Sequence, residues 1–164
     1  MKLWIFLDKK QNIFKKRVAF ATRFLFTFDI KEKQMSSIFT KIINGKIPSY
    51  KIAENENYYA FLDINPNAKG HTLVIPKKEV DKIFDLDAET YLGLMQFAHK
   101  VAKALEKTIA CNRVGMTVVG LEVPHAHVHL IPINRVSDIN FTSKKLKMQH
   151  NDFVKLAEEI SNNF

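Results

Sequence analysis

Three histidines occupy every second position of one short segment. His125, His127 and His129 alternate with apolar residues in the run 124–132. In an extended strand, alternate side chains point to the same face, so we expect the three imidazoles on one face and the intervening apolar residues on the other. The spacing therefore predicts a strand with one chemical face and one face in the core.

Imidazoles in this arrangement suit attack on a phosphate. A neutral imidazole is both a nucleophile and a general base near pH 7, because its unperturbed pKa is about 6.5. Rings two positions apart stand about 6.6 Å apart at Cα, so a central ring can attack phosphorus while the outer rings bind oxygens or transfer protons. The attack forms a phosphorus–nitrogen bond that water later breaks. Two alternatives stay open from the residues alone: a zinc or copper site, and three histidines on a solvated sheet face.

The elements that would position these histidines are short strands in succession. Apolar residues at helical spacing predict a short helix after the cap Ser37, a long helix after the cap Asp87, and a last helix after Asn151. The order of elements predicts an α+β fold, with an antiparallel sheet of about five strands, one long helix and one or two shorter helices. The expected strands are residues 50–53, 58–62, 71–76, 114–119 and 126–131.

The length of 164 residues suits one domain, residues 35–164, preceded by a basic aromatic extension, residues 1–34. The extension holds 9 Lys and Arg against 3 Asp and Glu, and the remainder holds 16 against 14, so the net charge of +8 lies mainly in the extension. We interpret it as a disordered leader or a start-site artefact. Contact with a membrane surface or with nucleic acid is the alternative, and no other part of the chain suggests such partners.

A single cysteine, Cys111, excludes an internal disulfide and a multi-cysteine zinc cage. Such a low cysteine count is typical of proteins in a reducing compartment, so we expect a cytoplasmic protein. His99 and His150 are expected on the surface, because neither belongs to the main apolar stripe of a predicted helix.

The run His-Ala-His-Val-His-Leu-Ile at 125–131 resembles the signature of the histidine triad (HIT) family of nucleotide-binding proteins. Three further blocks, residues 38–48, 61–66 and 71–78, resemble the family's opening helix and nucleoside-binding strands in the same order. The likeness spans about residues 37–133. Within this family, the chain resembles the Hint-like branch of nucleotide hydrolases and phosphoramidases.

By position, the resemblance implies that His127 attacks the α-phosphate and becomes transiently nucleotidylated. It implies that His125 and His129 orient and neutralise the phosphate, and that His71 joins them from a neighbouring strand. It implies no metal and no other cofactor. The expected partners are a purine nucleotide as substrate and a second copy of the chain in a symmetric homodimer.

Asp63 and a set of apolar residues are the expected nucleoside-binding groups. The Asp63 carboxylate, beside a turn, can accept both ribose hydroxyls, although Asp is also a common turn former. The resemblance places the base in an apolar slot, although side chains at helical spacing are core by default. The slot residues are Ile38, Phe39, Ile42, Phe61 and Ile64.

One segment departs from the family pattern. Residues 119–124 lack the hydroxyl and amide donors that help the leaving group depart, so Glu122 or a backbone anion nest would have to replace them. His129 stands where the nucleotidyltransferase branch has Gln, which favours water as the acceptor. The sequence therefore predicts a hydrolase of nucleoside monophosphate derivatives, either phosphoramidates or dinucleoside polyphosphates. The alternatives are a nucleotide-binding regulator or scaffold without turnover, and a histidine-rich metal-binding protein.

Overall fold

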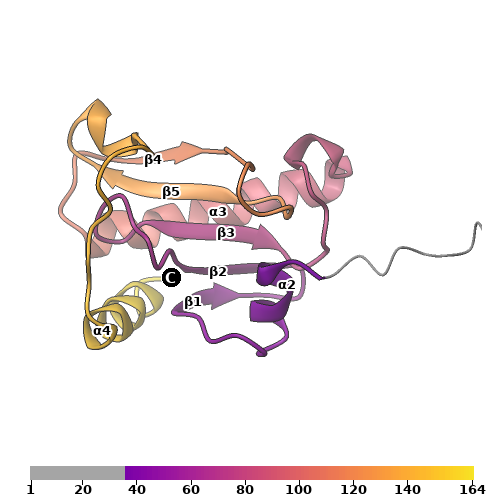
Figure 1. The fold of residues 1–164 in the computed structure, drawn as a ribbon, viewed down its shortest axis with the longest axis horizontal. Helices are drawn as coiled ribbons and strands as arrows, with labels where there is room; N and C mark the ends of the chain where they lie inside the picture. Colours follow the sequence, from indigo (N-terminus) through magenta and orange to yellow (C-terminus); the bar gives the residue numbers. More distant parts are fainter. Residues whose placement is uncertain (1–35) are drawn as a thin grey trace, which may run out of the picture. The chain divides into compact units, whose positions relative to one another are not determined.

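The computed structural model describes residues 36–164, so the predictions for residues 1–34 lie outside the described residues. Five strands form one antiparallel sheet in the order β1-β2-β3-β5-β4 (Figure 1). This arrangement confirms the predicted α+β fold. The strands are β1 (Lys51–Glu54), β2 (Tyr58–Leu62), β3 (Thr72–Pro76), β4 (Arg113–Thr117) and β5 (Val128–Ile133).

Within the described part of the chain, three α-helices accompany the sheet: α2 (Ile38–Ile43), α3 (Ala88–Thr108) and α4 (His150–Ser161). Both predicted caps are confirmed, because Ser37 Oγ accepts a hydrogen bond from the Thr40 N–H and Asp87 Oδ1 accepts one from the Thr90 N–H. Two short 3₁₀ turns that the sequence pattern did not predict, η1 (Ile83–Asp85) and η2 (Val136–Ile139), lie in the connections. Among residues 36–164, no helix has the length and apolar character needed to cross a bilayer.

The helices cover the two faces of the sheet unequally. In Figure 1, α3 runs behind the strands while α2 lies in front of them. Apolar residues of α3 and α4 form the larger core with one sheet face, and this core includes Ala126, Val128 and Leu130, as predicted. A smaller cluster packs α2 on the opposite face of β2 and β3. Because both faces are covered, β2 and β3 are buried along their whole length.

The strand that carries the triad begins later than predicted. β5 starts at Val128, so His125 and His127 precede the regular strand instead of lying within it. The Ala126 N–H donates to the Val80 carbonyl, 2.7 Å away, in the connection after β3. This bond replaces ladder pairing, while Leu73 of β3 pairs directly with His129. The triad therefore runs from a connecting segment into β5.

Candidate functional site

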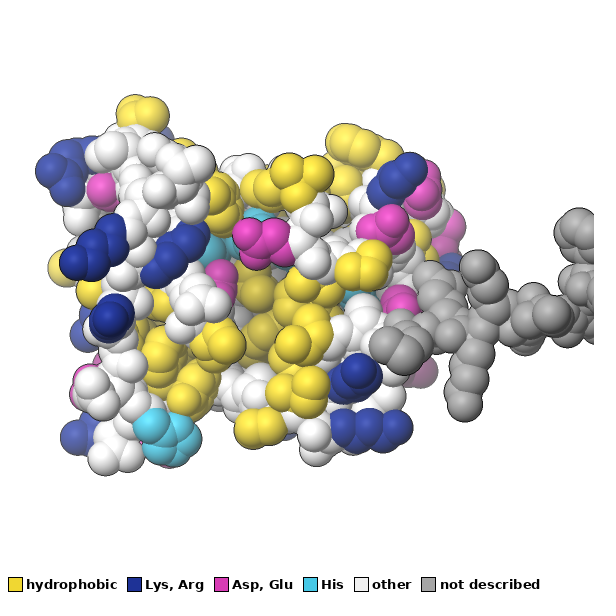
Figure 2. Space-filling model, in the orientation of Figure 1, with side chains coloured by type: hydrophobic (Ala, Val, Ile, Leu, Met, Phe, Trp, Pro, Cys, Tyr) yellow, Lys and Arg dark blue, Asp and Glu magenta, His cyan; other side chains and the backbone are white. Residues whose placement is uncertain are grey.

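The structure brings four predicted catalytic histidines together on the sheet face that α2 covers. His71 immediately precedes β3, and its ring centroid lies 5.2 Å from that of His129 on the neighbouring strand. The His127 ring lies 4.8 Å from the His129 ring, again between centroids. All four imidazoles, including that of His125, are buried. Figure 2 shows histidine surface recessed at the edge of a hollow lined by hydrophobic side chains.

The backbone of the triad segment fixes one proton of His127 on Nδ1. Its Nδ1 lies 2.6 Å from the His125 carbonyl oxygen. A carbonyl oxygen only accepts hydrogen bonds, so Nδ1 carries the proton and donates it. A neutral ring then has its lone pair on Nε2. This assignment leaves Nε2 as a nucleophilic nitrogen held in one orientation.

His125 has protein partners on both ring nitrogens. Its Nε2 donates to the Pro76 carbonyl oxygen at 2.8 Å, and Nδ1 lies 2.9 Å from Ser37 Oγ. Burial lowers the pKa of His125 below its ordinary value, which favours the neutral ring. In this geometry, His125 offers phosphate no free nitrogen. The geometry therefore gives the predicted phosphate contact of the His125 ring little support. It supports instead a role of the His125 carbonyl, which accepts the hydrogen bond from His127 Nδ1.

His71 and His129 form a directed chain of hydrogen bonds. The Asn67 N–H donates to His71 Nδ1 at 3.1 Å, so the proton of a neutral His71 is on Nε2. That Nε2 lies 3.0 Å from His129 Nδ1 and donates to it. Burial, with smaller contributions from nearby positive charges, lowers the pKa of each ring to about 3. His129 is therefore neutral and keeps its Nε2–H available for an oxygen of a ligand.

Asp63 lies at the end of β2, beside His71. Its Oδ2 is 3.5 Å from His71 Nδ1, and its Oδ1 accepts a hydrogen bond from the Asn65 N–H at 2.8 Å. The carboxylate therefore forms an Asx turn and also faces the histidine cluster. Its position is compatible with a turn-forming residue and with the predicted ribose-binding residue.

Asp63, His71 and His129 each place one possible metal-ligating atom within 4.8 Å of the others. Both ring nitrogens of His71 already have hydrogen-bond partners in the protein. A metal ion bound there would have to displace the hydrogen bond to Asn67 or the one to His129. The residues fit a hydrogen-bonded chain better than a metal centre.

The five residues predicted to hold the base divide into two groups. Phe39, Ile42 and Phe61 are buried in the smaller apolar cluster, where the Phe39 and Phe61 rings meet edge to face at 5.5 Å. Phe39 also contacts the His127 ring edge to face, with centroids 5.2 Å apart. Ile38 and Ile64 are exposed, with 48% and 68% of their surface accessible. The structure thus places one aromatic residue of the slot directly against the predicted nucleophile.

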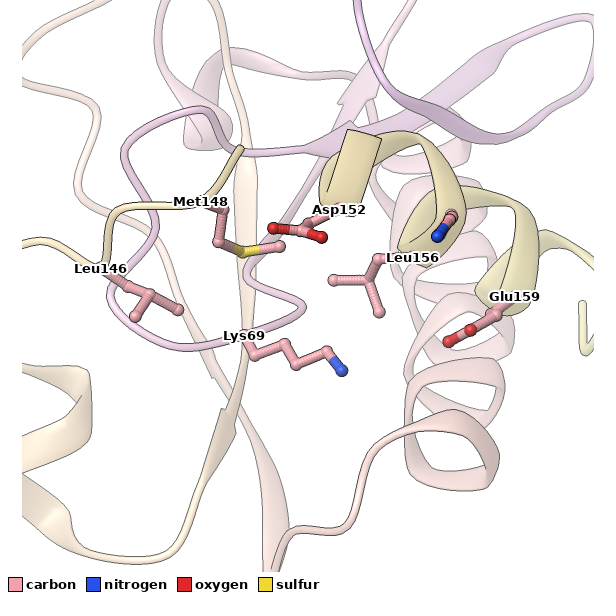
Figure 3. A pocket seen from close by; sticks show the side chains of 7 residues that line it. Lys69, Leu146, Met148, Asp152, Leu156 and Glu159 are labelled. Carbon is pink, nitrogen blue, oxygen red and sulfur yellow. The ribbon is translucent and has the colours of Figure 1, made fainter. Parts of the chain in front are cut away.

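A cavity of about 330 Å³ opens beside His127. Its lining is mainly apolar and includes Phe84, Val118 and Val119, with Asp81 and Lys82 as charged groups. A second cavity, of about 340 Å³, lies between α4 and residues 146–148 and shares no residue with the triad (Figure 3). Of these two cavities, the first is the one lined by a triad histidine.

Several neighbours of the triad escaped the sequence analysis. Glu79 and Thr40 form a hydrogen-bonded group with Ser37, which was predicted only as a helix cap. Lys145 is partly buried, and its Nζ donates to Asn67 Oδ1 at 2.5 Å. Phe141 packs edge to face on His129 at 4.8 Å. The hydrogen bonds of Glu79 and Lys145 join residues 39 to 78 positions apart, so local patterns carry no signal for them.

The two remaining histidines lie on the surface, as predicted. His99 is exposed on α3, and His150 is exposed at the start of α4, where its Nδ1 hydrogen-bonds the Tyr50 hydroxyl at 2.9 Å. Neither histidine contributes to the triad cluster.

The chain is similar in sequence and in fold to known proteins. Residues 44–136 match the model of the HIT domain. An uncharacterized HIT-like protein of Borreliella burgdorferi is 35% identical over 134 residues, which are 77% of this chain and 96% of that protein. The adenosine 5′-monophosphoramidase HNT1 of Saccharomyces cerevisiae is 43% identical over 96 residues, 58% of this chain and 61% of that protein. A crystal structure of a HIT-like protein from Bartonella henselae, 30% identical, aligns with a TM-score of 0.68 over 79% of this chain and 96% of that one. The chain belongs to the histidine triad (HIT) family.

Proposed function

We propose that the protein hydrolyses nucleoside monophosphate derivatives through a nucleotidyl intermediate on His127. The hydrogen bond from His127 Nδ1 to the His125 carbonyl carries this proposal, because in the neutral ring it leaves the lone pair on Nε2 and orients it. The name of the yeast relative, an adenosine 5′-monophosphoramidase, supports a phosphoramidate substrate and adenine as the base.

The reaction has two displacements at phosphorus. His127 Nε2 donates its lone pair to the α-phosphorus, and the bond from phosphorus to the leaving group breaks. The leaving group departs with that electron pair and takes up a proton from solvent through the open cavity beside His127. Water then attacks the same phosphorus, its proton passes to solvent, and the phosphorus–nitrogen bond breaks to restore neutral His127. Each step replaces one bond to phosphorus by another.

The neighbouring groups hold the substrate for this attack. The neutral His129 donates its Nε2–H to a phosphate oxygen and is itself oriented by His71. Asp63 accepts hydrogen bonds from the ribose hydroxyls. The base packs against the apolar cluster of Phe39, Phe61 and Ile42. Ile38 and Ile64, being exposed, contact the outer edge of the nucleoside.

The direct test is the release of AMP from adenosine 5′-phosphoramidate and from diadenosine polyphosphates, with a chelator present. We expect release by the intact chain and a loss of about 10³-fold or more in His127→Ala, because the nucleophile is removed. His99→Ala, which changes an exposed histidine outside the site, is the matched control. Nucleotide binding without release in the intact chain would refute the hydrolase and support a binding protein. Activity that appears only with added metal would support the metal-binding alternative.

We further propose a homodimer that joins the β4 edges of two copies. In residues 36–164, β4 is an outer strand of the sheet, and Met116 on it is 59% exposed. The neighbouring Val118 and the α3 residue Leu92 are also exposed. Pairing of two such edges would continue the sheet and cover these apolar side chains. The cytoplasmic location stays a prediction.

A further inference from the structure

Glu79, in the connection after β3, ties the start of α2 to the triad. The Ser37 N–H donates to both carboxylate oxygens, at 3.3 and 3.2 Å, and the Thr40 hydroxyl donates to Oε2. The Thr40 bond, followed by the Ser37 backbone bond, lowers the pKa of the Glu79 carboxyl. The ionised carboxylate only accepts hydrogen bonds, so it uses the single hydroxyl proton of Thr40.

The other end of this group fixes the His125 ring. Its Nε2 donates to the Pro76 carbonyl, so Nδ1 of the neutral ring is an acceptor. Ser37 Oγ lies 2.9 Å from Nδ1, while Thr40 Oγ1 lies 3.5 Å away and has given its proton to Glu79. Ser37 is therefore the donor to His125. The Thr40 hydroxyl proton thus points to Glu79, and the Ser37 hydroxyl proton points to His125.

The orientation of His125 bears directly on the nucleophile. The His125 carbonyl accepts the hydrogen bond that holds His127 Nδ1, and the intervening Ala126 N–H donates to the Val80 carbonyl at 2.7 Å. The connection after β3 thus holds the triad segment at Pro76 and at Val80, and Glu79 lies between these two contacts.

We propose that Glu79, acting through Thr40 and Ser37, is a positioning residue that sets the ring of His125 and, through its carbonyl, the direction in which His127 attacks. This inference rests on the proposed function. Glu79 touches no reacting atom and acts on the orientation of the nucleophile, so we expect its loss to lower kcat while KM changes little.

The test compares Thr40→Val, which removes only the hydroxyl donor, with Thr40→Ser, which restores it. We expect kcat for adenosine 5′-phosphoramidate to fall about 10- to 100-fold in Thr40→Val, with KM changed by about twofold or less, as for a small misplacement of a reacting group. Thr40→Ser should recover most of kcat. Glu79→Ala should reproduce the loss, and Glu56→Ala, the same change at an exposed glutamate, should not.

A second readout does not depend on catalysis. Nitrogen-15 NMR of the imidazoles should show His125 protonated at Nε2 and His127 at Nδ1 in the intact chain. In Thr40→Val and Glu79→Ala the His125 tautomer should persist, because Pro76 holds it, but the Nδ1 chemical shift should change as the Ser37 hydrogen bond weakens. Unchanged kcat and an unchanged Nδ1 shift in a folded Thr40→Val or Glu79→Gln variant would overturn the proposal. Failure of the intact chain to release AMP would instead refute the proposed function, while the Nδ1 shift would still decide the positioning role.

Discussion

Acidification should destabilise this protein through two buried histidines. The folded-state pKa of His71 and of His129 is about 3, against 6.5 for an ordinary histidine. Between these values the unfolded chain binds more protons than the folded one, so stability is present above pH 6.5 and is lost as the pH falls toward 3. From pH 7 to pH 5, each histidine should cost about 2 kcal/mol of the free energy of unfolding, since one pKa unit corresponds to about 1.36 kcal/mol.

Urea denaturation at pH 7 and pH 5 measures this loss. The His71→Gln variant cannot titrate at this position, so its free energy of unfolding should fall by about 2 kcal/mol less than that of the intact chain between the two pH values. Groups that do not contact His71 contribute to both proteins alike, and loss of the His71 charge, which lowers the pKa of His129, reduces the pH dependence in the same direction. His99→Gln, at an exposed site, should behave like the intact chain. Equal pH dependence in His71→Gln and the intact chain would show that His71 is not held neutral by burial, and the donor role of His129 would lose its basis.

Three other predictions concern charge, backbone and assembly. Lys145→Gln should raise KM about 2- to 10-fold in steady-state assays and weaken its salt dependence, because an ammonium beside the histidines is lost, whereas exposed Lys144→Gln should not. Gly70→Ala should lower the free energy of unfolding by about 1–3 kcal/mol more than Gly45→Ala, measured with urea. Both glycines have positive φ. A Cβ at Gly70 would overlap the Ile109 side chain, whereas a Cβ at Gly45 would meet no atom within 4 Å. Met116→Lys should convert the proposed dimer to monomer in light-scattering measurements.

Patterns of short period predicted most of the fold. Short runs rich in apolar and β-branched residues, bounded by turn formers, located all five strands to within about two residues. The caps Ser37 and Asp87 were also found, because a cap depends on residues three positions away. The start of β5 was wrong by two residues, since Ala126 bonds to Val80, a partner distant in sequence.

The site was predictable only where its residues follow a pattern. The triad alternates, and His71 and Asp63 stand at ends of strands that pair, so topology alone brings them near one another. Glu79 and Lys145 lie in connections whose path depends on tertiary packing, and neither has a local motif. Ser37 was identified as a cap, yet its hydroxyl also serves a histidine 88 positions away. Such double use of one side chain is visible only in three dimensions.

The protonation of the histidines decides how this site can bind an anion. Burial keeps His71, His125 and His129 neutral, so these rings offer hydrogen bonds rather than positive charge. Among the described residues, Lys145 is a cation whose charge acts on both His71 and His129. An anionic phosphate would reverse this effect, since its negative charge raises the pKa values that Lys145 lowers. A bound phosphate would therefore favour protonation of His71 and His129, whereas without it both rings are neutral hydrogen-bond donors.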